Sequence, residues 1–164
     1  MTLLARVNSG VSYLVAFLLL VATLAIAVQI IIRFILTGFG LTISAPWTEE
    51  LCRYAIVWSV YLGAAVLCRD DRLIAVDYLL HRLPARPAMI LQTLAVLCTL
   101  GFFGLSGWLG WKLFLTGLHE TAPVMRVPMA WVYAAVPLGA LLAICNSVAF
   151  FGSTLSSRAF EAEQ

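Results

Sequence analysis

The sequence predicts an all-α integral membrane protein, and both its composition and the length of its apolar runs indicate this. Of 164 residues, 63% are hydrophobic and 11% are charged, whereas soluble proteins carry about 25% charged residues. Four runs, 11–32, 51–68, 88–111 and 127–157, are long enough to cross about 30 Å of hydrocarbon as helices. Their continuous apolar character argues against the alternating segments of transmembrane strands. We expect one four-helix membrane domain over 1–164, with helices at about 11–33, 47–68, 88–115 and 128–152.

The distribution of basic residues predicts the orientation in the membrane. With the N-terminus inside, Arg6, Arg69, Arg72, Arg82, Arg86 and Arg158 lie on the inner side, and Arg33, Lys112 and Arg126 lie on the outer side. This excess places both termini in the cytoplasm by the positive-inside rule. The first run is longer than the apolar region of a cleaved signal peptide, so we expect helix 1 to be retained. The net charge of +2 is small and spread out, which argues against nucleic acid as a partner.

The start of helix 2 carries three charges at the membrane boundary. Glu49 and Arg53 are four residues apart and Glu50 and Arg53 are three apart, so both carboxylates can reach the arginine on a helix. Ionisable groups at membrane depth usually face protein, which predicts that these three contact a partner subunit. The alternative is a helix cap in which Arg53 reaches back to the interface. Trp58 follows Tyr54 by four residues and Glu50 by eight, so the three share one face.

Small residues predict places where helices approach closely. Gly63 precedes two alanines in helix 2, and such a patch lets another helix pack against its backbone. In helix 3, Gly101, Gly104, Gly107 and Gly110 follow one another at intervals of three, so they trace a groove that winds around the helix. The groove fits a partner subunit or another helix of this chain, and the sequence leaves both open.

Aromatic and basic side chains at the ends of the runs are expected to anchor the helices at the membrane interface. The expected anchors are Trp47, Tyr54, Arg69, Arg72, Arg82, Trp111, Lys112 and Trp131. Between helices 2 and 3, segment 72–83 gathers its leucines on one side of a helical wheel, which predicts a short amphipathic interfacial helix. In helix 4, Pro137 predicts a kink, and Asn146 is expected to hydrogen-bond across helices.

The sequence predicts neither catalysis nor a bound cofactor or metal. It has no glycine-rich phosphate loop and no nucleophile spaced from a base. His81 and His119 fall on opposite sides of the membrane in this topology, so they cannot share one haem or metal. The cysteines, Cys52, Cys68, Cys98 and Cys145, are interpreted as small buried hydrophobes. Helices 1, 3 and 4 have no ionisable residue at mid-depth, so we expect no transport site within this chain.

Several short matches occur in order between Trp47 and Gly139. They are Trp47-Thr48-Glu49-Glu50 with Arg53 and Trp58, Leu62-Gly63-Ala64-Ala65 with Arg69, Ile74 with Val76-Asp77, Ala122-Pro123, Val127-Pro128-Met129-Ala130-Trp131-Val132-Tyr133 and Pro137-Leu138-Gly139. In this order and spacing, the chain resembles the small membrane subunit of the tripartite ATP-independent periplasmic (TRAP) transporters. The inner loop departs from the family, because Asp71-Arg72-Leu73-Ile74 stands where a Gly-Gly-His-Ile stretch is often found.

The resemblance implies a non-catalytic scaffold subunit of a secondary-active importer that uses an ion gradient, here sodium, to take up organic anions such as carboxylates. It implies a multi-pass protein of the bacterial inner membrane. The implied partners are a large multi-span transporter subunit, beside which this chain packs, and a periplasmic substrate-binding protein that binds transiently. The alternative is the membrane anchor subunit of a respiratory enzyme complex, which would need paired histidines for haem.

Overall fold

The computed structural model describes residues 3–36, 45–69 and 85–162, and these residues are almost entirely helical. The elements are α1 (Leu3–Ile30), which continues as the π-helix η1 (Ile31–Leu36), α2 (Pro46–Leu67), α4 (Ala85–Gly117), the short α5 (Ala130–Tyr133) and α6 (Ala135–Ala162). Four helices of the described chain are long and apolar enough to cross a membrane, which confirms the predicted fold class. The predicted amphipathic segment 72–83, with Arg72 and Arg82, lies outside the described residues.

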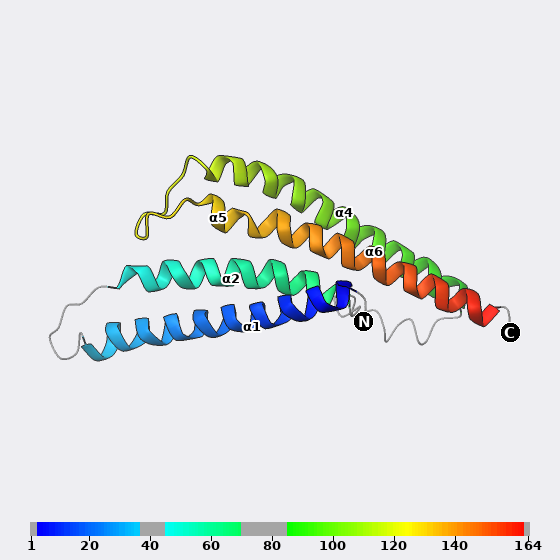
Figure 1. The fold of residues 1–164 in the computed structure, drawn as a ribbon, viewed down its shortest axis with the longest axis horizontal. Helices are drawn as coiled ribbons and strands as arrows, with labels where there is room; N and C mark the ends of the chain where they lie inside the picture. Colours follow the sequence, from blue (N-terminus) through cyan, green and yellow to red (C-terminus); the bar gives the residue numbers. More distant parts are fainter. Residues whose placement is uncertain (1–2, 37–44, 70–84, 163–164) are drawn as a thin grey trace.

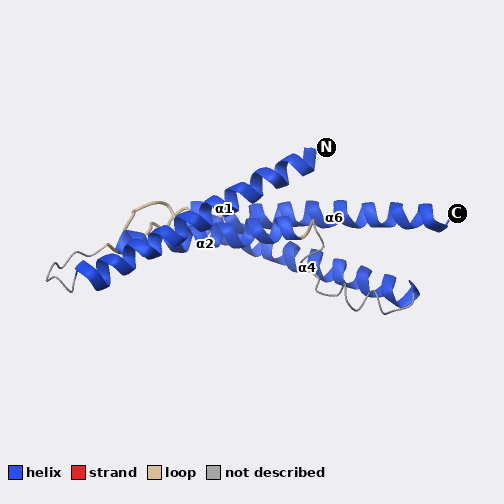
Figure 2. Ribbon diagram, turned by 90° about the horizontal axis from the view of Figure 1, so that it is seen from below, coloured by secondary structure: helices blue, strands red, loops and turns tan. Residues whose placement is uncertain are grey.

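The four long helices lie in a row in the order α1, α2, α6, α4 (Figure 1). Each helix packs on its neighbour in this row, so α2 and α6 lie inside it and α1 and α4 form its two edges. Seen from the edge, the helices overlap in the middle and splay apart toward the two termini (Figure 2). Both termini lie toward the same end of the molecule (Figure 1). We call this the terminal end and the opposite one the loop end.

Local sequence explains where α2 begins and where the last helix is interrupted. Pro46 stands at the first turn of α2, where a missing N–H is tolerated, and the Thr48 hydroxyl donates to the Ala45 carbonyl at 2.7 Å. The last helix breaks at Ala134, between α5 and α6. The break lies three residues before Pro137, which cannot donate a backbone hydrogen bond to the preceding turn. Ala134 itself keeps a right-handed helical backbone, with φ −58° and ψ −25°, so the interruption lies in the hydrogen bonding, and the predicted kink stays a prediction.

The packed core consists of two small clusters instead of one central core. One contains Ala65, Cys68, Phe103, Ala140 and Ala143, and the other contains Ala22, Ala25, Cys52 and Ala55. Most members are small, which allows neighbouring helices to approach closely. Cys52 and Cys68 are buried as predicted, whereas the same prediction is wrong for Cys98 and Cys145, which are exposed. The outward faces of the edge helices consist mainly of large exposed hydrophobic side chains.

A buried pair of amides joins three of the helices at the terminal end. The Asn8 and Asn146 side chains donate to each other's oxygens at 2.7 and 2.9 Å, and Asn146 also donates to the Ala65 carbonyl at 2.7 Å. Both amides are almost fully buried. Helix α1 begins at Leu3, earlier than its apolar run predicts, and the polar Asn8 in this extension is hydrogen-bonded inside the protein. Nearby, the Arg69 guanidinium donates to the Leu4 carbonyl at 3.2 Å.

Candidate partner interface

Three side chains on one face of α2 hold the segment that connects α4 to α6. The Glu50 carboxylate accepts the Met125 backbone N–H at 2.7 Å. One turn further along, the Tyr54 hydroxyl donates to the Met129 sulfur at 3.6 Å. We call Glu50, Tyr54 and Trp58 the α2 ladder, because they lie four residues apart and face the same segment. The sequence predicted their common face but not what it contacts.

Trp58 completes the α2 ladder near the break in the last helix. Its indole N–H donates to the Trp131 carbonyl at 3.2 Å. The polar edge of this tryptophan therefore joins α2 to α5. An indole N–H in an apolar setting usually finds such a partner. The ladder therefore ties the loop end of α2 to α5 and to the loop before it.

The loop between α4 and α5 is a small hairpin that supplies the contact for Glu50. Thr121 and Pro128 form an isolated antiparallel bridge, the Ala122 N–H donates to the Val127 carbonyl at 2.9 Å, and the Met129 N–H donates to the Glu120 carbonyl at 3.0 Å. Arg126 closes the turn with a φ of 53°. These bonds give the exposed tip of the loop a defined shape.

The three charges at the start of α2 separate into two environments. Glu50 is 6% exposed and faces the hairpin, whereas the side chains of Glu49 and Arg53 are 62% and 68% exposed and pair with each other at 3.3 Å. We expected both carboxylates to reach Arg53, but in the described chain only Glu49 forms the ion pair with it. The backbone N–H groups of the hairpin compete for Glu50, because a buried carboxylate needs hydrogen-bond donors.

The helix 3 glycines, which lie on α4, also separate into an inward and an outward pair. A Cβ added to Gly107 would meet the Ala140 Cβ at 3.3 Å, and one added to Gly110 would meet a Val136 methyl at 2.5 Å, so these two pack on α6. Gly101 and Gly104 have nothing within 4 Å of an added Cβ. On α2, Gly63 has its nearest neighbour, Val15 of α1, at 3.8 Å. The predicted groove therefore serves internal packing along one half and stays open along the other.

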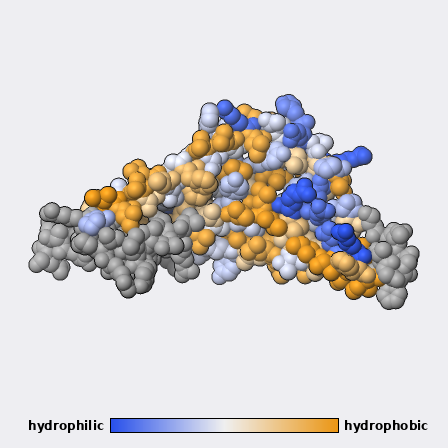
Figure 3. Space-filling view, turned by 180° about the vertical axis from the view of Figure 1, so that it is seen from behind, coloured by the Kyte–Doolittle hydropathy of each residue, from blue (hydrophilic) through white to orange (hydrophobic). Residues whose placement is uncertain are grey.

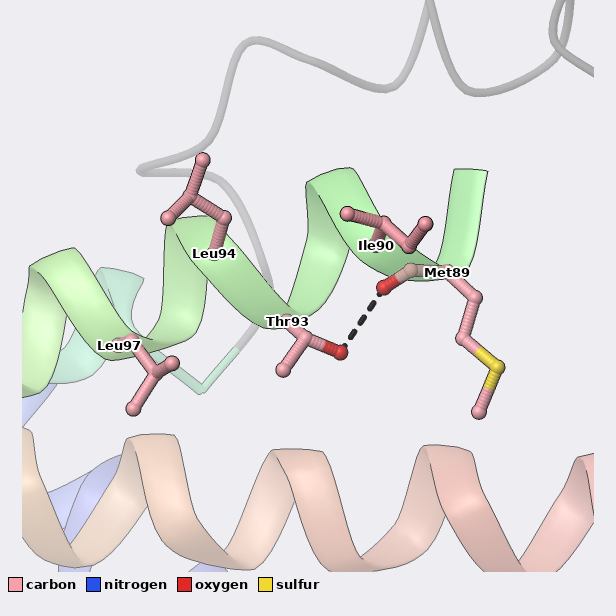
Figure 4. A pocket seen from close by; sticks show the side chains of 5 residues that line it. All are labelled: Met89, Ile90, Thr93, Leu94 and Leu97. Carbon is pink, nitrogen blue, oxygen red and sulfur yellow. Dashed lines mark hydrogen bonds between the residues drawn. The ribbon is translucent and has the colours of Figure 1, made fainter. Parts of the chain in front are cut away.

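An apolar groove lies on α4 beyond these open glycines, toward the terminal end. The groove has a volume of about 430 Å³ and is lined by Met89, Ile90, Thr93, Leu94 and Leu97 (Figure 4). The Thr93 hydroxyl donates to the Met89 carbonyl at 2.8 Å, so it places no unsatisfied donor in the groove. We call the surface of Leu94, Leu97, Gly101, Gly104 and Leu105 the α4 face, because all five are outward and apolar or small.

Comparison with known families identifies the class of protein. The family described as "Tripartite ATP-independent periplasmic transporters, DctQ component" matches residues 22–156. The chain belongs to this family. It is therefore a small subunit of a TRAP transporter, and a transporter component instead of an enzyme. The family assignment decides between the two function classes suggested by the sequence, in favour of the transporter and against the respiratory anchor.

Three relatives illustrate the range of similarity. "C4-dicarboxylate TRAP transporter small permease protein DctQ" from Rhodobacter capsulatus is 32% identical over 102 residues, which cover 61% of this chain and 45% of that protein. "Putative TRAP transporter small permease protein" from Haemophilus influenzae is 25% identical over 141 residues, covering 83% of this chain and 81% of that protein. "Isethionate TRAP transporter permease protein DctMQ" from Oleidesulfovibrio alaskensis is 29% identical over 97 residues, covering 58% of this chain and 15% of that protein.

The expected membrane anchors of this TRAP subunit fall into outward and inward groups. Trp47, Trp111 and Trp131 are exposed, and the Lys112 ammonium lies 3.8 Å from the centre of the Trp108 ring. Tyr54 is half-buried and bonded within the α2 ladder. Hydrophilic surface gathers near the loop end of the face shown in Figure 3, while most of the remaining described surface there is hydrophobic.

Sequence reasoning missed two residues that organise this TRAP subunit. Asn8 was not singled out, although an amide at the same depth as Asn146 on an antiparallel helix was a usable signal. Glu120 was also missed. Its carboxylate accepts the Tyr133 hydroxyl at 3.4 Å and so links the hairpin to α5. No signal predicted the Met125 backbone as the partner of Glu50, because a backbone donor leaves no mark in the sequence.

Proposed function

We propose that this chain is the scaffold subunit of a sodium-driven importer of organic anions, in which it packs beside a large permease subunit in the bacterial inner membrane. Family membership is the observation that carries the proposal. The relatives supply its details, since one is named for C4-dicarboxylates. Another is a permease named DctMQ, of which the segment similar to this chain makes up 15%. A stable association with a larger membrane polypeptide is consistent with both names.

The arrangement of the helices supports a scaffold role. In the row, α1 packs mainly on α2, and α4 packs mainly on α6. Most of the apolar surface of these two edge helices therefore faces outward. We assign the large permease to the α4 face, because Gly101 and Gly104 let a partner helix approach the backbone closely. Helix α1 instead presents bulky groups such as Tyr13, Phe17 and Leu20, which suit contact with lipid chains.

The hairpin between α4 and α5 is the proposed docking element for the periplasmic binding protein. With both termini in the cytoplasm, the loop end faces the periplasm, in keeping with the positive-inside distribution. Glu50 fixes the hairpin by binding the Met125 N–H, while the side chains at its tip, including Arg126, remain exposed. A shaped and exposed tip suits transient contact with a soluble partner. In this role Glu50 acts on the binding protein through the hairpin.

Site-specific photo-cross-linking in the native membrane tests the proposed packing. A photoreactive residue at Gly104 or Leu97 should yield an adduct with the large permease. The same residue at Leu20 of α1 is the matched control, since that position is equally apolar and outward, and it should yield lipid adducts only. Permease adducts from Leu20 with none from the α4 positions would overturn the assigned face. Adducts with no large membrane protein at any position would overturn the scaffold role.

A further inference from the structure

A groove with both charged and apolar walls lies between α1 and α2 near the loop end. Its volume is about 490 Å³. Gln29 and η1 residue Arg33 contribute from one side, and Glu49 and Arg53 contribute from α2. The groove is separate from the α2 ladder, which faces the hairpin, and from the α4 face at the opposite edge of the row. Neither the family assignment nor the proposed scaffold role accounts for its charges.

The polarity of the groove changes with depth. Because α1 and α2 run in opposite directions, the polar residues of both helices come together near the loop end, while Ile26 and Ile56 line the part nearer the membrane centre. From Ile26 to Arg33 the helix rises by about 10 Å, at about 1.5 Å per residue. The groove therefore has a charged mouth near the ends of both apolar helices and an apolar floor further along them. This order matches that of an amphiphile standing in the leaflet.

The charges at the mouth favour an anion. Glu49 is already paired with Arg53 at 3.3 Å, whereas Arg33 forms no ion pair within the described part of the chain. Two guanidinium groups and one carboxylate give the mouth a formal charge of +1. A guanidinium has five N–H donors, so Arg53 keeps donors available beyond the one used by Glu49. Guanidinium groups bind phosphate oxygens with planar, charge-assisted hydrogen bonds.

The backbone places Arg33 at this mouth through an irregular turn. The last six residues of the first helix form a π-helix, η1, which has one more residue in each hydrogen-bonded turn than an α-helix. Such turns are rare and are frequent at functional sites. The wider turn changes the direction of the side chains that follow Ile30, and Arg33 lines the groove from within it. The irregular backbone and the unmatched charge thus occur at the same place.

We propose that this groove binds one anionic phospholipid, with its phosphodiester between Arg33 and Arg53 and the start of its acyl chains over Ile26 and Ile56. Gln29 supplies a neutral hydrogen bond at the rim. Glu49 competes with the phosphodiester for Arg53, so its carboxylate limits the affinity for the lipid. A lipid held here would fill the open side between α1 and α2 and fix the depth of this edge of the row in the bilayer.

Native mass spectrometry of the full chain, extracted in the complex it forms in its own membrane, tests the proposal. After mild delipidation, phosphatidylglycerol is added and the bound copies are counted. Wild type should retain one copy through further detergent washing, and Arg33→Gln with Arg53→Gln should reduce that retention at least tenfold. Arg126→Gln is the control, because it removes one guanidinium charge from the same end outside the groove, and its retention should equal that of wild type, whereas Arg33→Gln or Arg53→Gln alone, each also losing one charge, should lower it. Glu49→Gln should raise retention, which a merely structural role of this carboxylate would not produce.

The remaining outcomes contradict the proposal. Equal retention by wild type and the double variant would show that the arginines do not hold the lipid. Displacement of the lipid by an equal concentration of inorganic phosphate would show a simple anion site. Equal or tighter retention of phosphatidylethanolamine would show that the head group need not be anionic. Loss of a protein subunit from the double variant, with lipid retained, would assign the arginines to a protein contact.

Discussion

Replacing Asn146 with alanine removes three buried hydrogen bonds that join α1, α2 and α6. Asn146 is 1% exposed, and its amide pairs with Asn8 in both directions and with the Ala65 carbonyl. Hydrogen bonds within membrane proteins contribute about 0.6 kcal/mol each on average. Three of them predict a loss of about 2 kcal/mol in the free energy of unfolding. Asn8→Ala removes two of the three and should cost about 1 kcal/mol by the same value.

The double variant distinguishes a coupled pair from two independent side chains. The double variant Asn8→Ala/Asn146→Ala loses the same three hydrogen bonds as Asn146→Ala alone. Its free energy of unfolding should therefore fall by about 2 kcal/mol, and not by about 3 kcal/mol, which is the sum of the two single losses. The coupling is therefore about 1 kcal/mol. Unfolding in mixed micelles of increasing sodium dodecyl sulfate content, followed by tryptophan fluorescence, measures these values. Thr23→Ala is the control, since its hydroxyl bonds only within its own exposed helix. Additive costs, or a cost of Asn146→Ala no larger than that of the control, would show that the two amides do not stabilise the protein as a bonded pair.

Two further predictions concern the loop end and the glycines. Glu50→Ala should make the Met125 amide exchange with solvent about tenfold faster, because this amide loses its hydrogen-bond acceptor. Glu49→Ala is the control and should leave that exchange unchanged. An equal effect of both variants in hydrogen-deuterium exchange would contradict the prediction. Gly110→Ala should destabilise the protein by about 1–3 kcal/mol through overpacking, whereas Gly104→Ala should stay within about 0.5 kcal/mol. The same micelle titration compares them, and equal stability of the two would show that α4 and α6 are not closely packed.

The sequence was sufficient to predict the helices, because the period and length of apolar runs determine which segments can cross a bilayer. The interrupted hydrogen bonding near Pro137 was also predictable, since proline lacks the donor that the helix needs. The order of the helices in the row was not. It depends on small residues such as Gly139, where an added Cβ would lie 2.7 Å from the Tyr61 Cβ. Composition identifies such a residue as permissive but does not say which helix it meets.

In the candidate interface, too, one part of the arrangement could be predicted from the sequence and another part could not. The shared face of Glu50, Tyr54 and Trp58 followed from helical geometry, because residues four apart lie above one another. Their partners did not follow, since two of the three are backbone groups more than seventy positions away: the Met125 N–H of the hairpin and the Trp131 carbonyl of α5. Spacing also suggested that Glu50 pairs with Arg53, and this was wrong because the hairpin supplies closer donors. Local spacing predicts which groups can meet, while tertiary packing selects among them.

As the proposed scaffold subunit, this chain should support transport only together with a large permease. The most direct test reconstitutes liposomes with this chain, with the large permease, or with both, in the presence of the loaded binding protein and a sodium gradient. We expect carboxylate uptake only when both are present and loss of that uptake when the gradient is collapsed. Sodium-dependent uptake by this chain without a partner, or full uptake by the large permease without this chain, would contradict it.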